Sequence, residues 1–382
     1  MNTLFTSARK LDAAGQVDSF WMFVDSGTIV STGSGHPPYS LTGIETVERV
    51  EVAGRWLVPG FIDLHSHGGG AHSYDDGPDA IALALAAHRR HGTTRHVISL
   101  VANPIAQLRE SLIAIAARAE SDPLVLGSHL EGPFLSRAAR GAHNPDFLLE
   151  PLPYQLEELL NASRGTLRQI TIAPELSGAL EAIDILVENR VAVAIGHTEA
   201  GFDLARSAFD RGARILTHVF NAMPGIHHRA PGPVIAAFED DRVTIELILD
   251  GLHVHPDVAS MVFASAPGRV ALITDAMAAA GATDGDYCLG TLNVTVRDGL
   301  AVLSGTSTIA GSTLTQDVAL RCAMAKSGLS PRDAVSALTI TPARALGIES
   351  RHGLLAPGFV ADAVLLDHDW QVTEVWGAGR RL

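Results

Sequence analysis

Hydrophobic residues in the middle of the chain fall into eight short runs, which are separated by longer stretches with helical periodicity. The runs occupy residues 58–64, 94–101, 124–130, 169–173, 191–195, 214–217, 244–249 and 270–274. The intervening stretches are rich in Ala, Leu, Arg and Glu, and they include residues 79–91, 104–119, 178–189 and 201–211. Strands that alternate with helices form parallel sheets, so eight such units predict an α/β protein with a closed (β/α)8 TIM barrel.

The two ends of the chain have a different pattern. Short β segments broken by Gly, Ser and Pro lie at residues 20–24, 28–30, 47–52, 363–366 and 372–375. The C-terminal segments are too few to bury a face alone, and chain termini commonly lie close together. We therefore expect residues 1–55 and 353–382 to form one small β-sandwich domain, and residues 56–352 to form the barrel.

Composition and charge narrow the class of partner. The chain has 382 residues, of which 47% are hydrophobic and 18% charged, and this balance excludes a disordered or fibrous protein. Lys and Arg number 28 against 42 Asp and Glu, which gives a net charge of −14, and no basic block stands out. We therefore expect neither nucleic acid nor a membrane as a partner, but a small molecule.

The N-terminus and the cysteines bear on location. The first residues lack the apolar segment of a signal peptide, and no apolar run reaches the roughly 18 residues of a membrane span. Cys288 and Cys322 are the only cysteines, and they have neither CxxC nor zinc-ribbon spacing. Both features favour a cytoplasmic protein without a disulfide framework.

Histidines and a carboxylate follow several of the apolar runs. His65 and His67 end the first run and precede three glycines, and because residues i and i+2 of a strand face the same side, their imidazoles can converge. Glu131 follows the third run, and His197 and His218 follow the fifth and sixth. Each alone is a weak signal that a capped core residue or a loop residue would also give. Together, at the end of the barrel where TIM-barrel enzymes place their chemistry, they predict a divalent metal site.

Asp275 follows the eighth run and completes this ring of polar strand ends. A carboxylate beside a metal can take a proton from activated water and return it to a leaving group. The alternative is a helix N-cap, because an Ala-rich stretch follows Asp275, but we favour catalysis. His129 would share the face of Glu131, and we interpret it as a supporting or packing residue rather than a ligand.

This order of residues is similar to that of the amidohydrolase superfamily. Its members place HxH after the first strand, a carboxylate or carboxylated lysine midway, His after strands five and six, and Asp after strand eight. The chain has only two lysines, Lys10 in the N-terminal segment and Lys326 in a late predicted helix, so neither lies at a barrel strand end. The resemblance then implies the subtype in which Glu131 is the middle ligand.

Whole segments resemble the N-acetylglucosamine-6-phosphate deacetylase family over nearly the whole chain. In order, they are residues 59–63 (PGFID), 129–134 (HLEGPF), 140–144 (RGAHN), 196–198 (GHT), 217–223 (THVFNAM), 250–254 (DGLHV), 274–276 (TDA) and 310–312 (AGS). Several motifs in the same order are more specific than any one of them. The resemblance implies a metal-dependent hydrolase of amino-sugar catabolism that converts N-acetyl-D-glucosamine 6-phosphate to D-glucosamine 6-phosphate and acetate.

The resemblance also implies roles for individual residues. Glu131, His197 and His218 would bind metal, and Asp275 would be the catalytic acid and base. Substrate contacts would come from Ala142, His143, Asn221, Ala222, Arg229, His253, Ile309, Ala310 and Gly311. In the family, this arginine reaches the neighbouring subunit's active site, so Arg229 implies a homodimer.

Members of the family that keep HxH can hold two metal ions. His65 and His67 therefore imply a second metal position, which Glu131 can bridge. The expected metal is Zn²⁺, with one or two ions per subunit, and Fe²⁺, Co²⁺ or Mn²⁺ are the alternatives.

The residues leave three other functions open. A deacetylase for N-acetylgalactosamine 6-phosphate would differ only in the orientation of one substrate hydroxyl. Another amidohydrolase, such as an N-acyl-D-amino-acid deacylase, would use the same metal residues. A barrel that serves as a non-catalytic scaffold is the third, and the retained metal residues and Asp275 argue against it.

Overall fold

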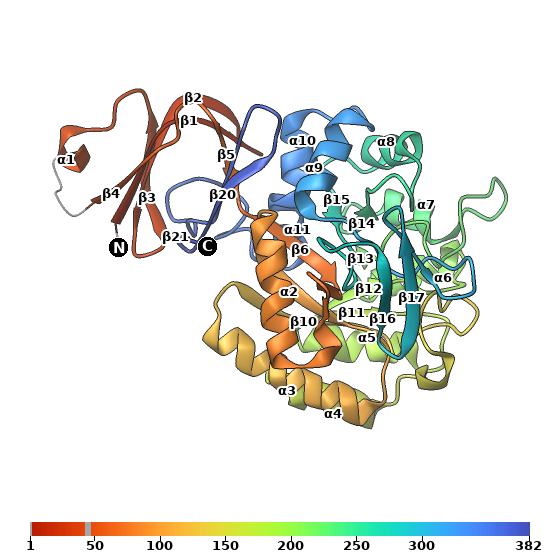
Figure 1. The fold of residues 1–382 in the computed structure, drawn as a ribbon. Coiled ribbons are helices and arrows are strands. Elements are labelled where there is room, and N and C mark those ends of the chain that lie inside the picture. The colour runs from red at the N-terminus through yellow and green to blue at the C-terminus, as the bar shows by residue number, and fades with distance from the viewer. Residues whose placement is uncertain (1, 43–46) are drawn as a thin grey trace.

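The computed structural model describes residues 2–42 and 47–382, and its largest unit is a parallel eight-stranded sheet curved into a barrel (Figure 1). In order around the barrel, its strands are β6 (Phe61–Ser66), β9 (Thr93–Leu100), β10 (Val125–Glu131), β11 (Leu167–Ile172), β12 (Ala192–Ile195), β13 (Ile215–Leu216), β14 (Thr244–Ile248) and β15 (Val270–Ile273). Each strand coincides with one of the eight apolar runs. The predicted (β/α)8 barrel is therefore confirmed.

The barrel closes where β15 meets β6. The Asp275 N–H donates to the carbonyl oxygen of His65 at 2.8 Å. Beneath them, the buried Asp63 carboxylate accepts a hydrogen bond from the Thr274 hydroxyl at 2.7 Å. These contacts join the first and last strands at the level where the predicted metal residues emerge.

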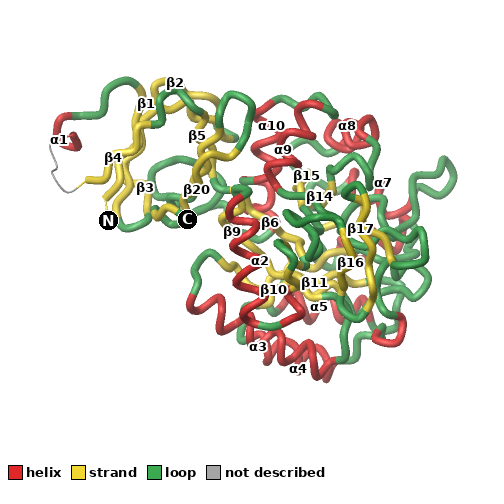
Figure 2. The backbone as a smooth tube through the Cα atoms, in the orientation of Figure 1, coloured by secondary structure: helices red, strands yellow, loops and turns green. Residues whose placement is uncertain are grey.

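Helices surround the barrel on its outer side, as Figure 2 shows in red around the yellow strands. They are α2 (Pro78–Arg90), α3 (Ile105–Ser121), α4 (Pro153–Ser163), α5 (Ala179–Glu188), α6 (Phe202–Asp210), α7 (Gly232–Glu239), α8 (Pro256–Ser265), α9 (Gln316–Ala325), α10 (Pro331–Leu338) and α11 (Ile340–Ala345). Their apolar sides join the barrel core; α2, for example, buries Ile81, Ala84 and Leu85 there. Over the described ranges, none of the helices is long and apolar enough to cross a membrane.

Strands from both ends of the chain form a second eight-stranded sheet beside the barrel (Figure 1). Its order is β21 (Arg380–Arg381), β20 (Val372–Gly377), β19 (Ala363–Leu366), β5 (Trp56–Pro59), β1 (Asn2–Asp12), β2 (Gly15–Asp25) and β3 (Thr28–Ser34), with β4 (Val47–Glu51) also paired to β1. Phe5, Met22 and Trp376 lie in its apolar core. The division of the chain at residues 55 and 352 stays a prediction, and residues 1 and 43–46 of the predicted terminal domain lie outside the described residues.

A three-stranded antiparallel sheet after β15 was not predicted from the sequence. It consists of β16 (Gly285–Leu289), β17 (Leu292–Arg297) and β18 (Leu300–Leu303). The turn at Asp298 and Gly299 has positive φ at both residues, 50° and 75°, which is the hairpin geometry that an Asp-Gly pair favours. That pair was the available signal. Leu289 and Val294 of this sheet pack on Met277, just past the end of the barrel.

The remaining elements are short. They are α1 (Tyr39–Thr42), the two-residue strands β7 (Gly68–Gly69) and β8 (His72–Ser73), and the 3₁₀ turns Tyr74–Asp76 and Pro145–Phe147.

Candidate active site

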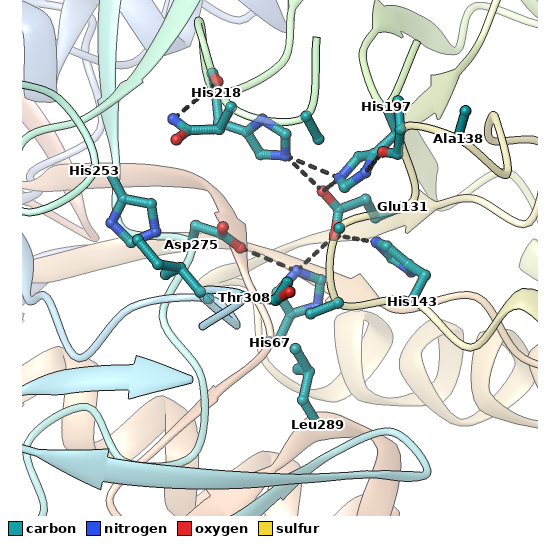
Figure 3. Close-up of a pocket in the computed structure, with 17 residues that line it drawn as sticks. His67, Glu131, Ala138, His143, His197, His218, His253, Asp275, Leu289 and Thr308 are labelled. Atoms are coloured by element: carbon teal, nitrogen blue, oxygen red, sulfur yellow. Dashed lines mark hydrogen bonds and ion pairs between the residues drawn. The ribbon is translucent and has the colours of Figure 1, made fainter. Parts of the chain in front are cut away.

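A cavity of about 300 Å³ lies at the carboxyl ends of the barrel strands (Figure 3). Most of the residues predicted from the sequence line it, namely His67, Glu131, Ala142, His143, His197, His218, Asn221, Ala222, His253, Asp275, Ile309 and Gly311. The topology of a parallel barrel brings these residues together from segments far apart in the sequence.

Three predicted residues do not line the cavity. His65 has no exposed surface and lies beneath the floor, in contact with Glu131. Ala310 is also fully buried and packs with the core of the small sheet. Arg229 is exposed on the loop between β13 and α7, where its guanidinium contacts His228. A single chain therefore does not bring Arg229 into its own cavity.

Other lining residues escaped the sequence analysis. Ala138, Ala139 and Gly141 come from the loop after β10, and Leu289 and Thr308 come from the region of the small sheet. Their side chains are small or apolar, so they carry no chemical signature that would mark them. The hairpin signal at Asp298 predicts strands in the segment that follows Asp275 in the sequence. This segment contains Leu289 and Thr308, so the signal would have made it a candidate for the cavity wall.

The Glu131 carboxylate lies at the centre of the polar cluster (Figure 3). Its Oε1 is 3.0 Å from His218 Nε2, 3.1 Å from His197 Nε2 and 3.2 Å from His65 Nε2. Its Oε2 is 3.1 Å from His67 Nε2. One carboxylate thus contacts both histidine pairs, as a ligand shared between two metal positions would.

Hydrogen bonds on the far side of two imidazoles decide which nitrogen faces the cluster. The Nδ1 of His197 lies 2.9 Å from the Ala139 carbonyl oxygen, and the Nδ1 of His65 lies 3.3 Å from the Glu246 carboxylate. Because both partners are acceptors, each Nδ1 carries a hydrogen, and Nε2 is the nitrogen that faces the cluster. A metal ion in the cluster would bind this nitrogen.

His143 has the opposite arrangement. The backbone N–H of Ala102 donates to its Nδ1 at 3.2 Å, so the Nε2 of the neutral ring carries the hydrogen and faces Glu131 Oε2 at 3.3 Å. Burial lowers the pKa of His143 to about 4, which keeps the ring neutral. His143 is therefore suited to donate a hydrogen bond and not to bind metal, although it lies among potential ligands.

The electrostatics of the cluster favour a bound cation. Burial alone would lower the pKa of His67, but hydrogen bonds and charges from Asp275 and Glu131 raise it to about 9. The two buried carboxylates thus draw positive charge, and potential ligand atoms of His65, His67, Glu131 and Asp275 lie within 4.8 Å of one another. Imidazole nitrogens and carboxylate oxygens are the donors of zinc and similar divalent ions, so the residues present fit such a metal.

The backbone bends sharply where the side chains enter the cavity. His197, His218 and Asp275 have left-handed φ angles of 47°, 23° and 48°, which residues other than glycine rarely adopt. Each is the second residue after its strand, so this turn directs the side chain toward the cavity. Uncommon backbone conformations of this kind cluster at functional sites.

Asp275 occupies one side of the cavity next to the first-strand histidines. Its Oδ1 is 3.2 Å from His67 Nε2 and 3.5 Å from His65 Nε2. Burial alone would raise the pKa of Asp275, but the charges of these histidines lower it, which keeps the carboxylate ionised. Ala276 forms β-bridges with Ser66 and Ser312, and residues 278–281 form turns. No helix begins directly after Asp275, so the N-cap interpretation is excluded.

His253 faces Asp275 across the cavity (Figure 3). Its Nδ1 donates to the Asp250 carboxylate at 2.7 Å, which leaves Nε2 available to a ligand. Burial alone would lower the pKa of His253, but this hydrogen bond and the charges of Asp250 and Asp275 raise it. His253 can therefore supply a positively charged donor.

His129 is a supporting residue, in agreement with its predicted role. Its Nδ1 lies 2.9 Å from the Ser99 hydroxyl and its Nε2 lies 2.9 Å from the Thr171 hydroxyl, so neither nitrogen is free for a metal. Neither lysine lines the cavity. Lys10 forms an ion pair with Asp12 in β1, and Lys326 ends α9.

The turn after His67 packs closely on α2. A Cβ atom on Gly69 would lie 2.8 Å from His88 Nε2, and one on Gly68 would lie 2.4 Å from the His72 carbonyl oxygen. His88 Nε2 lies 2.8 Å from the Gly68 carbonyl oxygen, so it donates to that oxygen and ties the turn to the helix. Glycine at these positions lets the backbone approach α2 while His67 points into the cluster.

Comparison with known proteins agrees with this geometry. The amidohydrolase family model matches residues 56–381. The N-acetylgalactosamine-6-phosphate deacetylase of Escherichia coli O157:H7 is 40% identical over 329 residues, which cover 85% of this chain and 87% of that protein. The N-acetylglucosamine-6-phosphate deacetylase of Homo sapiens is 35% identical over 347 residues, which cover 87% of this chain and 84% of that protein.

A solved structure is also similar over the whole length. The N-acetyl-D-glucosamine-6-phosphate deacetylase of Mycobacterium smegmatis, an aspartate-to-alanine variant in complex with N-acetyl-D-glucosamine 6-phosphate, superposes with a TM-score of 0.93 at 42% identity. The superposition covers 100% of this chain and 99% of that one. The resemblance seen in the sequence is confirmed. The chain therefore belongs to the amidohydrolase family, in the group of amino-sugar-phosphate deacetylases.

Proposed function

We propose that the protein hydrolyses the acetamide of N-acetyl-D-glucosamine 6-phosphate and releases D-glucosamine 6-phosphate and acetate. The observation that carries this proposal is the Glu131-centred cluster of imidazoles beside Asp275, at the base of a cavity of about 300 Å³. The similarity to deacetylases of human and mycobacterial origin supports the choice of reaction.

We propose that Glu131, His197 and His218 hold one divalent ion, and that His65 and His67 hold a second that Glu131 shares. Zn²⁺ is the proposed metal, because its usual ligands are the nitrogens and carboxylates found here; Fe²⁺, Co²⁺ and Mn²⁺ accept similar ligands. When bound, such an ion supplies Lewis acidity toward the amide carbonyl and toward water.

Asp275 moves the proton in this proposal. Its carboxylate accepts a proton from the attacking water as the oxygen bonds to the amide carbon. The carbon–nitrogen bond then breaks, and Asp275 returns the proton to the departing amine, so that the carboxylate is regenerated. His67 lies 3.2 Å from Oδ1 and fixes the position of this carboxylate.

The other lining residues orient the sugar. His143 presents an N–H and His253 a positively charged imidazole, and both suit the oxygens of a sugar or phosphate. We propose further contacts from Ala142, Asn221, Ala222 and the segment of Ile309, Ala310 and Gly311. Ala310 would act by shaping this segment, since its own side chain is buried.

The phosphate gives a reason for a homodimer. None of the described residues that line the cavity is arginine or lysine. A phosphate dianion favours a guanidinium, and Arg229 is exposed on a loop outside its own cavity. We propose that Arg229 enters the cavity of a neighbouring copy of the chain.

The galactosamine epimer is the second candidate substrate. The relative from Escherichia coli O157:H7, at 40% identity, is an N-acetylgalactosamine-6-phosphate deacetylase, and this observation favours the epimer. The two substrates carry the same acetamide and phosphate, so the same catalytic residues serve both.

We also propose a cytoplasmic location. The thiol of Cys288 is exposed and unpaired, and that of Cys322 is buried and unpaired. Free thiols fit a reducing compartment.

The test is a comparison of substrates on one preparation of known metal content. Acetate release is measured with N-acetylglucosamine 6-phosphate, its galactosamine epimer, unphosphorylated N-acetylglucosamine and an N-acetyl-D-amino acid. We expect the highest kcat/KM for N-acetylglucosamine 6-phosphate, loss of activity after chelation and recovery with Zn²⁺. No turnover of either phosphorylated sugar would refute the proposal.

A further inference from the structure

A carboxylate lies buried inside the barrel beneath the metal cluster. Glu246, on β14, has no exposed surface, and its two oxygens face two different partners. Oε1 accepts a hydrogen bond from Gln169 Nε2 at 2.7 Å, and Oε2 lies 3.3 Å from His65 Nδ1. Neither Glu246 nor Gln169 lines the cavity, so neither can contact the substrate.

Burying a carboxylate is unfavourable unless it is well paired, so its location requires a reason. The hydrogen bond from Gln169 occupies one oxygen and fixes the side chain. The other oxygen accepts the Nδ1 hydrogen of His65, and this hydrogen bond turns Nε2 of the ring toward the cluster.

His65 Nε2 faces other potential ligand atoms of the cluster. His65 Nε2 is 3.1 Å from His67 Nε2 and 3.2 Å from Glu131 Oε1. Such an arrangement is stabilised by a cation between the donors. The hydrogen bond to Glu246 therefore fixes the orientation of the His65 ring, with Nε2 toward these atoms.

We infer that Glu246, fixed by Gln169, is a positioning residue for the metal position at His65 and His67. The inference rests on the proposed function, because it takes its two metal positions from there. The other position is oriented separately, since the Nδ1 of His197 is held by the backbone carbonyl of Ala139. Changing Glu246 should therefore weaken one metal position and leave the other intact.

The first test measures metal affinity in the full-length protein. Zn²⁺ is titrated into the metal-free wild type and into Glu246→Gln in competition with a chelating indicator. The amide is neutral, so His65 loses its charged acceptor even where the amide oxygen still accepts the Nδ1 hydrogen. We expect two sites in the wild type and, in the variant, a loss of about 10–100-fold in the affinity of one site only.

Two further variants serve as matched controls. Thr171→Val removes a buried hydroxyl that contacts His129 and Thr217 inside the same barrel but touches no metal residue, and it should keep both sites. Adding His67→Asn to Glu246→Gln should weaken the same site further and leave the other site unchanged, because both changes act on the same position.

A second variant removes the hydrogen bond altogether. Glu246→Leu offers no acceptor to the His65 Nδ1, so the affinity of the same site should fall at least as far as in Glu246→Gln. Folding of each variant is checked by thermal unfolding.

Three results would overturn the inference. They are wild-type affinity at both sites in Glu246→Gln, an equal loss at both sites, or only one site in the wild type. Acetate release is measured on the same wild-type preparation. If the protein deacetylates the substrate but binds one metal ion, the proposed function holds and only the positioning role of Glu246 is refuted.

Discussion

Hydrogen-bond partners outside the cavity decide what each histidine of the site can do. His65 and His197 have acceptors at Nδ1 and therefore offer Nε2 to a metal, whereas His143 has a backbone donor at Nδ1 and offers an N–H. The three rings are chemically identical in the sequence. Their different roles arise from one backbone carbonyl, one backbone N–H and one carboxylate.

Asp275→Asn tests proton transfer at this scale. The amide keeps the size of the side chain but cannot accept the proton of water, so kcat should fall by about 10²–10⁴-fold. Metal content should match the wild type, because Glu131 and the four histidines remain. Acetate release and metal analysis on the same sample check both statements, and near wild-type turnover would refute the assignment of Asp275.

The sequence allowed the metal residues to be predicted because each lies at a strand end with a chemically distinctive side chain. His65, His67, Glu131, His197 and His218 were found this way, and the structure brings them within contact of one another. Glu246 was missed because a single glutamate within an apolar run gives no sign of which strand it faces. Its role depends on a contact between the first and seventh strands of the barrel.

At the scale of elements, the turn between β6 and α2 links the metal residues to the barrel wall. The backbone of Gly68 and Gly69 lies against α2, and His88 donates to the Gly68 carbonyl oxygen. The position of His67 therefore depends on a helix that has no contact with the substrate.

Gly69→Ala tests this dependence. The new Cβ would lie 2.8 Å from His88 Nε2, so the turn or the ring must move. We expect a loss of roughly 1–3 kcal/mol in the free energy of unfolding, together with lower kcat and weaker metal binding. Gly201→Ala is the matched control, because nothing lies within 4 Å of its Cβ, and it should behave as the wild type. Equal behaviour of the two variants in metal binding would contradict this view.

Elements differed in how well the sequence predicted them. The barrel strands are almost wholly buried, so they read as continuous apolar runs that are easy to find. The strands of the small sheet alternate buried and exposed residues over only four to six positions, as in Leu292–Arg297. Such short alternation is easily taken for a loop, and this is why the sheet was missed.

At the scale of the whole molecule, a buried ion pair connects the terminal sheet to the barrel. Arg95 of β9 donates to both oxygens of Asp362, with Nε–Oδ2 at 2.7 Å and Nη2–Oδ1 at 3.0 Å. The Ala378 N–H donates to the same carboxylate at 2.7 Å. Burial alone would raise the pKa of Asp362, but the charge of Arg95 and these hydrogen bonds, with one from His352, lower it to about 2.

This pKa predicts a dependence of stability on pH. Because the folded state lowers the pKa of Asp362, the carboxylate stabilises the fold above about pH 4, and the contribution, roughly 2 kcal/mol, is lost as the pH falls toward 2. Asp362→Asn should cost about 3–5 kcal/mol near pH 7, since Arg95 stays buried without its partner. The difference from the wild type should shrink below pH 4.

Urea unfolding of both proteins between pH 7 and 2.5 measures this difference. Asp369→Asn, a change at an exposed aspartate, is the control and should leave the free energy of unfolding unchanged. A constant difference between Asp362→Asn and the wild type at all pH values would show that Asp362 does not titrate as described.

Arg229→Ala tests the proposed dimer. If Arg229 acts in the cavity of the neighbouring copy, this variant should have a raised KM for the phosphorylated sugar and an unchanged one for the unphosphorylated sugar. Mixing it with Asp275→Asn after joint refolding should recover activity, because a hybrid dimer contains one cavity with an intact Asp275 and a partner's intact arginine. No recovery in a verified hybrid would contradict the proposal.

The small sheet β16–β18 contributes to the wall of the cavity but supplies none of the proposed metal ligands. It leaves the barrel after β15 and returns before α9, and it contributes Leu289 to the cavity wall. Every proposed metal ligand, in contrast, belongs to a barrel strand or to the two residues just beyond one. Mutations in this insertion can therefore reshape the wall without displacing a ligand. Evolution can retune the choice between sugar epimers there while the hydrolytic machinery is inherited unchanged.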